Sequence, residues 1–399
     1  MTAENRSAPA HIHTADLLTA RQWVVRAIAA PARESGIAWP EGLSAGVLTE
    51  LLTYERCAAW LLDSLSSAGL AEGLPANVLE AIRKAAARET QTAMQARAEG
   101  RELSSVAARL GLSMAVLKGG VRAIAGESPS LPVVDIDVLV DHGHVSQVVT
   151  ELERSGFGRA LPALRHHQGV EAAKGRLSVE VHWTMFDDGR PLDPELWSRI
   201  IPIAASPGLF RLNSVDHLMH IVRHALLNHR QRHITIRDTL LAGIAARNCS
   251  SDEMTTVQRQ LTGAPNEGEA VRMISFGGRL VGAQGESSDP FFEESATFYS
   301  AVALAPRLPR ALASSAALAF MTEIALGRVA VMRAVKNSVQ WRGSSVKAAA
   351  KANDRFPRLA RPLIGLAHLG YYGISAAIAL PMIYRTRDKA LRELGRRNL

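Results

Sequence analysis

The segment Val133–Val140 constrains the fold most, because it reads Val-Val-Asp-Ile-Asp-Val-Leu-Val and sets two carboxylates inside an apolar run. A short run of β-branched residues after a loop rich in Ser and Pro predicts a central, buried strand. Side chains two residues apart on a strand project to the same face, so we expect Asp135 and Asp137 to lie side by side. Carboxylates held that close repel each other, and Mg²⁺, which prefers oxygen ligands, compensates them well. The run therefore predicts a metal-binding strand, although an Asp-x-Asp pattern alone also arises by chance.

A second strand is predicted over Leu177–Met185, where apolar and polar residues alternate and the polar face carries Glu180 and His182. If this strand pairs beside the first, Glu180 joins Asp135 and Asp137 around metal. Two metal ions about 4 Å apart would then activate an attacking hydroxyl and stabilise a departing pyrophosphate. The alternative is that Glu180 is an ordinary exposed surface residue.

Two glycines follow a short apolar strand that ends at Lys118. At a strand-to-helix turn, Gly119 and Gly120 allow backbone N–H groups to approach a phosphate, and the start of the next helix adds a favourable dipole. Lys118 is placed to neutralise phosphate charge, and Arg122 either binds phosphate or has a structural role. The alternative is an ordinary turn without a ligand.

A helix is predicted over 215–228 with Ser214 as its N-cap. His217, His220 and His224 share one face of this helix because they lie three and four residues apart. Such spacing allows a zinc site. We interpret the histidines instead as packed, hydrogen-bonded residues or as part of the lining of a nucleotide cleft.

The chain is basic, with a formal net charge of +8, which favours anionic partners such as nucleotides, nucleic acid or acidic lipids. A solvated surface rich in Arg is the alternative. A helix over 235–246 sets Arg237 beside Asp238. Arg237 either forms a buried ion pair that fixes this helix or reaches the triphosphate of a nucleotide.

Apolar residues at helical spacing predict that most of the remaining sequence is helical. The helices are expected over 14–30, 44–65, 75–110 (one long helix or two joined ones) and 298–335, with weaker structure over 250–290. The two cysteines, Cys57 and Cys249, lie far apart and indicate neither a disulfide framework nor a metal site. The first thirty residues lack a continuous apolar core, so we expect a cytoplasmic protein.

The segment 363–384 contains no Asp, Glu, Lys or Arg. Its length is close to the roughly 20 residues that span a bilayer, and basic residues flank it. Several glycines and Pro381 weaken it as a helix in lipid. We interpret it as a buried C-terminal helix, and the alternative is contact with a membrane surface or insertion into it.

Four motifs occur in the order VLKGG, VVDIDVLV, GFGR and LSVEVHW. This order resembles the DNA polymerase β-like nucleotidyltransferase superfamily, and within it a bacterial family of uncharacterised nucleotidyltransferases, over roughly residues 105–245. The resemblance implies two Mg²⁺ ions (with Mn²⁺ as an alternative) held by Asp135, Asp137 and Glu180, and a phosphate turn at Gly119 and Gly120. Two departures concern nucleotide affinity: the superfamily commonly has Ser at the position of Gly120, and family members often carry Arg and Ser just before the first Asp.

The expected fold is α+β, with a small mixed nucleotidyltransferase sheet between large N-terminal and C-terminal helical additions. The expected division is 1–104 N-terminal helical, 105–210 nucleotidyltransferase core, 211–345 helical, and 346–399 a basic and apolar tail. The expected reaction moves an NMP from an NTP to an acceptor hydroxyl or phosphate on a small molecule, peptide product, protein or RNA. The alternative function is a regulatory module that binds nucleotide without turnover, with or without membrane association through 363–384. The sequence defines neither the acceptor nor the oligomeric state.

Overall fold

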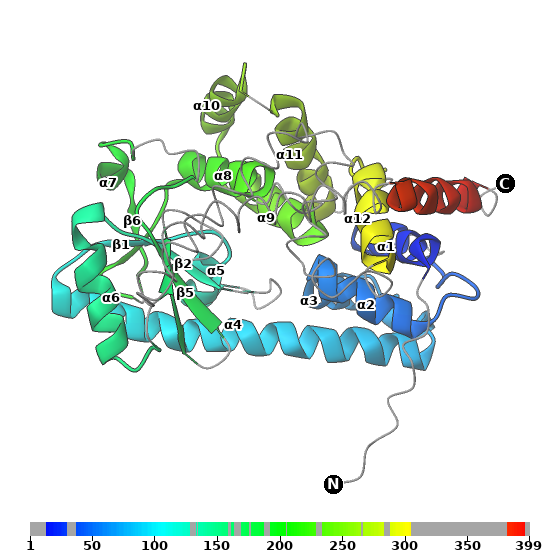
Figure 1. Ribbon diagram of the computed structural model, residues 1–399, viewed down its shortest axis with the longest axis horizontal. Coiled ribbons are helices and arrows are strands. Elements are labelled where there is room, and N and C mark those ends of the chain that lie inside the picture. Colours follow the sequence, from blue (N-terminus) through cyan, green and yellow to red (C-terminus); the bar gives the residue numbers. More distant parts are fainter. Residues whose placement is uncertain are drawn as a thin grey trace, which may run out of the picture.

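The chain folds into a mixed sheet beside a larger helical part (Figure 1). The computed structural model describes residues 13–29, 37–127, 133, 135–158, 161–162, 169–174, 177–186, 192–204, 206–228, 234–264, 266–282, 288–304 and 381–395. The helices are α1 (Thr14–Ala29), α2 (Ala45–Glu55), α3 (Ala58–Ser67), α4 (Ala76–Leu110), α5 (Gly120–Ala125), α6 (Val145–Arg154), α7 (Leu196–Arg199), α8 (Ser214–Arg223), α9 (Ile236–Arg247), α10 (Ser251–Leu261), α11 (Glu267–Gly282), α12 (Phe292–Leu304) and a last helix over 381–395. The strands are β1 (Met114–Val116), β2 (Ile136–Leu139), β3 (Leu161–Pro162), β4 (Gly169–Lys174), β5 (Leu177–His182), β6 (Ile201–Pro202) and β7 (Leu209–Arg211).

The strands form one sheet in the order β3-β4-β5-β2-β1-β7-β6. Its centre is mixed, because β2 runs parallel to β5 and antiparallel to β1, while β1 runs parallel to β7. The apolar run that contains Asp137 is therefore a central strand, as the sequence predicts. The mixed sheet among many helices confirms the predicted α+β class.

One face of the sheet packs on α4 and α6, and α8 lies over the other (Figure 1). Ile136 and Val138 of β2 and Val179 and Val181 of β5 are fully buried in the core on the α4 side. Since side chains alternate along a strand, the residues between them face α8. That second face carries Asp137, Glu180 and His182.

The helices before and after the sheet in sequence share one hydrophobic core. Leu18 of α1, Leu48 of α2, Leu240 of α9 and Phe276 of α11 are all fully buried in it. The last helix contributes Ala390 and Leu394 to the same core. The predicted N-terminal and C-terminal helical additions are therefore packed together.

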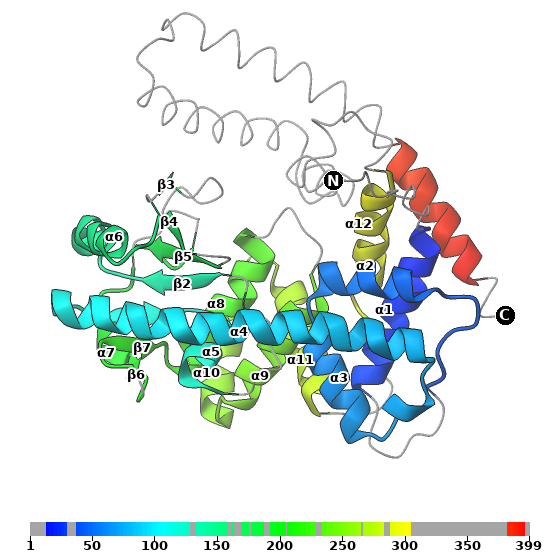
Figure 2. The same cartoon turned by 90° about the horizontal axis from the view of Figure 1, so that it is seen from below.

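Helix α4 connects the two cores, and Figure 2 shows it running past both the sheet and the helical part. Ile82 and Ala86 belong to the helical core, whereas Leu103 and Val106 belong to the core of the sheet. The structure confirms one long helix here, where the sequence allowed one helix or two joined ones.

A buried ionic network holds α1, α2, α9 and α12 together. Arg21 binds the carboxylates of Glu55 and Asp289, the latter at 2.6 Å from Nε, and its Nη2 donates to the carbonyl oxygen of Ile234 at 3.4 Å. Glu55 also accepts a hydrogen bond from the hydroxyl of Tyr299. Charges fully removed from water need such complete pairing.

Several predicted boundaries are wrong. The helix expected over 44–65 is two helices, because the backbone of Arg56 is left-handed with φ 49° and ψ 52°. The strands are shorter than the expected 133–140 and 177–185, and Asp135 lies just before β2. Asn213, rather than Ser214, is the N-cap of α8, since its side chain accepts from the backbone N–H of Asp216.

The region 250–290 has more structure than expected, because it contains all of α10 and α11. Within the helix expected over 298–335, the structure describes residues only as far as Leu304, where α12 ends. Apart from 381–384, the segment 363–384 lies outside the described residues, so its membrane contact stays a prediction. Within the described residues, every helix is too short or too polar to cross a bilayer.

Candidate active site

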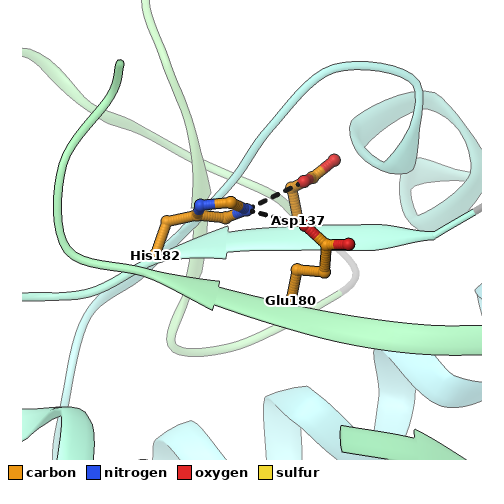
Figure 3. Close-up of side chains that lie close together, drawn as sticks. All are labelled: Asp137, Glu180 and His182. Atoms are coloured by element: carbon orange, nitrogen blue, oxygen red, sulfur yellow. Dashed lines mark hydrogen bonds and ion pairs between the residues drawn. The ribbon is translucent and has the colours of Figure 1, made fainter. Parts of the chain in front are cut away.

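Parallel pairing of β2 with β5 assembles the centre of the site. Asp137 lies directly opposite Glu180 in the register, and His182 follows two residues later on the same face. The His182 Nε2 atom is 2.9 Å from Asp137 Oδ1 and 3.4 Å from Glu180 Oε2. Figure 3 marks both contacts with dashed lines. One ligand atom from each of the three residues lies within 4.8 Å of the others. The sheet therefore brings two of the three predicted carboxylates together.

Two cations of the protein compensate Asp137. Lys118 Nζ lies 3.0 Å from Asp137 Oδ2, on the opposite oxygen from the one that His182 contacts. Burial alone would raise the pKa of Asp137, but Lys118 and His182 outweigh burial and hold this pKa well below its usual value. Burial would lower the pKa of His182, but the hydrogen bonds to Asp137 and Glu180 raise it to about 9. At neutral pH the imidazole is therefore charged.

Asp135 is the third predicted carboxylate and lies outside the tight group of Asp137, Glu180 and His182. Burial and the neighbouring charge of Asp137 raise the pKa of Asp135, against the influence of Lys118. Among the described residues, neither a hydrogen bond nor an ion pair within 4 Å reaches its side chain. Asp135 is thus the acid of this centre whose charge the protein compensates least.

The donors present fit a divalent cation. Two carboxylates within reach of one point, with a third beside them, supply the oxygen ligands that Mg²⁺ or Mn²⁺ takes. His182 adds an imidazole, although as a protonated ring it acts as a counter-ion, and a metal bound through it has to replace its proton. His182 takes the place in the tight group that the sequence analysis assigned to Asp135.

The turn between β1 and α5 differs from the expectation in one respect. The residue with a left-handed backbone is Lys118, at φ 50°, whereas Gly119 has φ −67° and caps α5. Gly120 is buried, and a Cβ atom there would lie 3.2 Å from Val116 Cγ1. Packing against β1 therefore explains this glycine, and the phosphate-binding role of Gly119 and Gly120 stays a prediction.

Helix α8 closes the site from the side opposite α4. A small cavity beside Asp137 is lined by Leu117, Lys118, Asp137, His182, Thr184, Met185, His220 and His224. Burial lowers the pKa of His220 well below its usual value, so its ring is neutral, and it stacks on Phe186 with 5.8 Å between the centroids. Within the described part of the chain, the histidines of α8 do not form a group that could hold a metal, so the zinc alternative gains nothing.

The two predicted arginines have different surroundings. Arg122 pairs with Glu127 at 3.2 Å and lines a second cavity, away from Asp137, together with Arg211, Ser214 and His217. Arg237 lies 3.8 Å from Asp238, which agrees with the predicted ion pair. The charge of Arg237 also acts on Asp135, where it partly opposes the rise in the pKa of Asp135 that burial causes. Of the two, only Arg237 is placed toward the carboxylates.

The profile of a protein family described as an uncharacterised nucleotidyltransferase matches residues 42–240. The chain belongs to this family over that stretch. The family resemblance expected from the sequence motifs is thereby confirmed, and membership supports nucleotidyl transfer as the general function. The matched stretch begins in the N-terminal helices, well before the expected core at 105, so the match includes α2, α3 and α4. Comparison with curated proteins and with solved structures gave no match.

Besides the contact of His182 with Asp137, sequence reasoning missed two features of the site. One is the ion pair of Lys118 with Asp137, which depends on the order of strands in the sheet. The other is Arg56, which lies within electrostatic range of Asp135 and Arg237. A regular apolar stripe runs through both α2 and α3, so nothing in the local pattern indicated a break at Arg56.

Proposed function

We propose that this protein is a metal-dependent nucleotidyltransferase that moves an NMP from an NTP to an acceptor hydroxyl or phosphate. The observation that carries the proposal is the register of β2 and β5, which sets Asp137 opposite Glu180 with Asp135 just before the strand. Three acids on one buried face are unfavourable without cations, and nucleotidyl transfer by two-metal chemistry needs such a set.

In the proposed reaction the acceptor oxygen forms a bond to the α-phosphorus of the NTP. The bond from this phosphorus to the α,β-bridging oxygen breaks, and pyrophosphate leaves with the electron pair. Bound Mg²⁺ supplies Lewis-acid stabilisation of the charge that develops on phosphate. Glu180 takes the proton of an acceptor hydroxyl, because its side chain is 15 % exposed whereas that of Asp137 is 1 % exposed and bonded to Lys118. An ionised acceptor phosphate carries no proton to remove.

The basic residues around the carboxylates bind the NTP. Lys118 neutralises Asp137 in the structure and lies directly before the glycine turn. The ammonium group of Lys118 would be available for a phosphate oxygen if Asp137 held a metal ion instead. Gly119 and Gly120 are proposed to place backbone N–H groups near the phosphates.

The test is release of pyrophosphate by the full chain, with Mg²⁺, each of the four NTPs and a broad pool of acceptors. Asp137→Asn should lower the rate at least roughly 10³-fold, because it removes a charge that acts in the transition state. Asp252→Asn, an exposed acid on α10, is the matched control and should leave the rate unchanged. Nucleotide binding without turnover under every condition would favour the regulatory module, and absence of nucleotide binding would reject both functions.

A further inference from the structure

The junction of α2 and α3 holds Arg56 in a backbone conformation that residues other than glycine rarely adopt. Its φ of 49° and ψ of 52° lie in the left-handed region, and its backbone N–H closes α2 by donating to the carbonyl oxygen of Leu52. The short side chains of Asn and Asp can stabilise this conformation through a local hydrogen bond, whereas the Arg side chain does not. Such residues persist where the surrounding structure fixes them, and they cluster at functional sites.

The surrounding structure does fix this junction. Glu89 of α4 accepts hydrogen bonds from the backbone N–H groups of Ala58 and Ala59 at the start of α3, at 3.1 and 2.8 Å. On the other side, Glu55 Oε2 accepts from the backbone N–H of Ile236 at 2.7 Å. Glu55 directly precedes Arg56, and Ile236 directly precedes Arg237. The hydrogen bond between α2 and α9 therefore brings the backbones of the two arginines close together.

Each arginine has a feature that disfavours its charge. Arg237 lies in the first turn of α9, where the helix dipole disfavours a positive charge, and its contact with Asp238 is 3.8 Å long. Within the described part of the chain, no hydrogen bond or ion pair reaches the guanidinium of Arg56, although the residue is half-buried. Burial and the charge of Arg237 lower the pKa of Arg56, against Asp135, Asp238 and Glu89. The two like charges therefore lie within electrostatic range of each other and of Asp135.

We propose that Arg56 and Arg237 form a guanidinium pair that binds the triphosphate of the nucleotide, so that the α2–α3 junction completes the active site. Guanidinium groups bind phosphate oxygens through two parallel hydrogen bonds, and a polyanion between them removes their mutual repulsion. The pair lies on the side of Asp135, so the phosphates would bridge from the pair toward the carboxylates. The inference rests on the proposed function, and both residues fall within the family match over 42–240.

The experiment is calorimetric titration of the full chain with ATP and Mg²⁺ and, separately, with inorganic tripolyphosphate. Arg56→Gly removes the guanidinium while keeping a residue that adopts the left-handed backbone readily, so the fold is preserved. Arg56→Lys keeps the charge but loses the two-pronged contact. Arg101→Ala, on the exposed side of α4, changes the net charge by the same amount as Arg56→Gly and is the matched control.

We expect Arg56→Gly to weaken both ligands by roughly tenfold or more, Arg56→Lys to recover part of the affinity, and Arg101→Ala to bind as the wild type does. Thermal unfolding of Arg56→Gly should be no lower than that of the wild type, because the glycine relieves the backbone. Binding by Arg56→Gly within twofold of the wild type would overturn the guanidinium pair while leaving the proposed function intact. A wild-type chain that binds neither ligand would overturn both.

Discussion

Two clusters of buried charge lie in different parts of this molecule, and they are compensated to different degrees. In the helical part, Arg21 and Glu55 have fully buried side chains, and Arg21 divides its donors among Glu55, Asp289 and the backbone of Ile234. At the sheet, Lys118 and His182 both act on Asp137 and leave Asp135 with a raised pKa.

The difference distinguishes a structural cluster from a functional one. The Arg21 cluster joins four helices, and each of the three guanidinium nitrogens donates to a partner within the protein. The carboxylate cluster lies at a cavity, and one of its acids, Asp135, has no hydrogen-bond or ion-pair partner among the residues that the structure describes. Burial of charge by itself indicates neither role, and the degree of compensation within the protein is the more informative property.

The largest expected effect on stability is in the helical cluster. Arg21→Ala should lower the free energy of unfolding by about 3–5 kcal/mol, because Glu55 and Asp289 are left buried without their cation. Chemical denaturation measures the change, and Arg26→Ala, exposed on the same helix, is the control. Pyrophosphate release per folded molecule should change little. A loss of stability below about 1 kcal/mol would remove the contrast between the clusters.

Mg²⁺ should stabilise the protein only through the carboxylate cluster at the sheet. Mg²⁺ at a concentration of about 100 times its dissociation constant should stabilise the wild type by about 2.7 kcal/mol, because it binds only the folded state. Arg21→Ala should keep this stabilisation and Asp137→Asn should lose it, as thermal unfolding with and without Mg²⁺ would show. An equal gain in Asp137→Asn would place the ion elsewhere.

Asp135→Asn should stabilise the metal-free protein by about 1 kcal/mol at pH 7, because it removes a charge that burial and Asp137 both oppose. The gain should shrink as the pH falls, since the native Asp135 takes up a proton and loses the same repulsion. The variant should also lose most of the stabilisation by Mg²⁺. Destabilisation at pH 7 would mean that Asp135 is better compensated than its surroundings indicate.

The smallest expected effect is a pH dependence of the folding stability that arises from His217 in the second cavity. Burial, with the charges of Arg211 and Arg122, lowers the pKa of His217 to about 4. Because the folded value lies below the unfolded one, the unfolded state binds the proton first, and stability falls as the pH drops below about 6.5. Between pH 7 and 5.5 the wild type should lose about 1 kcal/mol more than His217→Gln. Equal losses in the two proteins would show that this histidine titrates normally.

The sequence predicted the two central strands because each is a short β-rich run with distinctive polar residues. It placed Glu180 and His182 on one face because alternation along a strand fixes which side chains share a side, and the pairing found between β2 and β5 then sets Asp137 opposite Glu180. It missed that His182 binds Asp137, because that contact depends on which strands are neighbours and in what register. Local pattern contains neither piece of information.

The break at Arg56 illustrates a different limit. Leu52 and Leu61 keep helical spacing through 44–65, yet Arg56 between them has a left-handed backbone. Two hydrogen bonds hold this break: Glu55 accepts from the backbone N–H of Ile236, and Glu89 accepts from that of Ala58. The helix α10 was predictable, by contrast, since Ser250 and Glu253 form a capping box that is visible in the sequence. The polar composition of that region concealed it.

Helix α4 has a consequence for how the molecule comes apart. At 35 residues and 1.5 Å per residue it is about 50 Å long, and it supplies side chains to both hydrophobic cores. Loss of either core would strip half of this helix of its packing, so melting in one half destabilises the other. The chain should therefore unfold in a single cooperative transition, and a proteolytic cut within α4 should yield no half that survives alone.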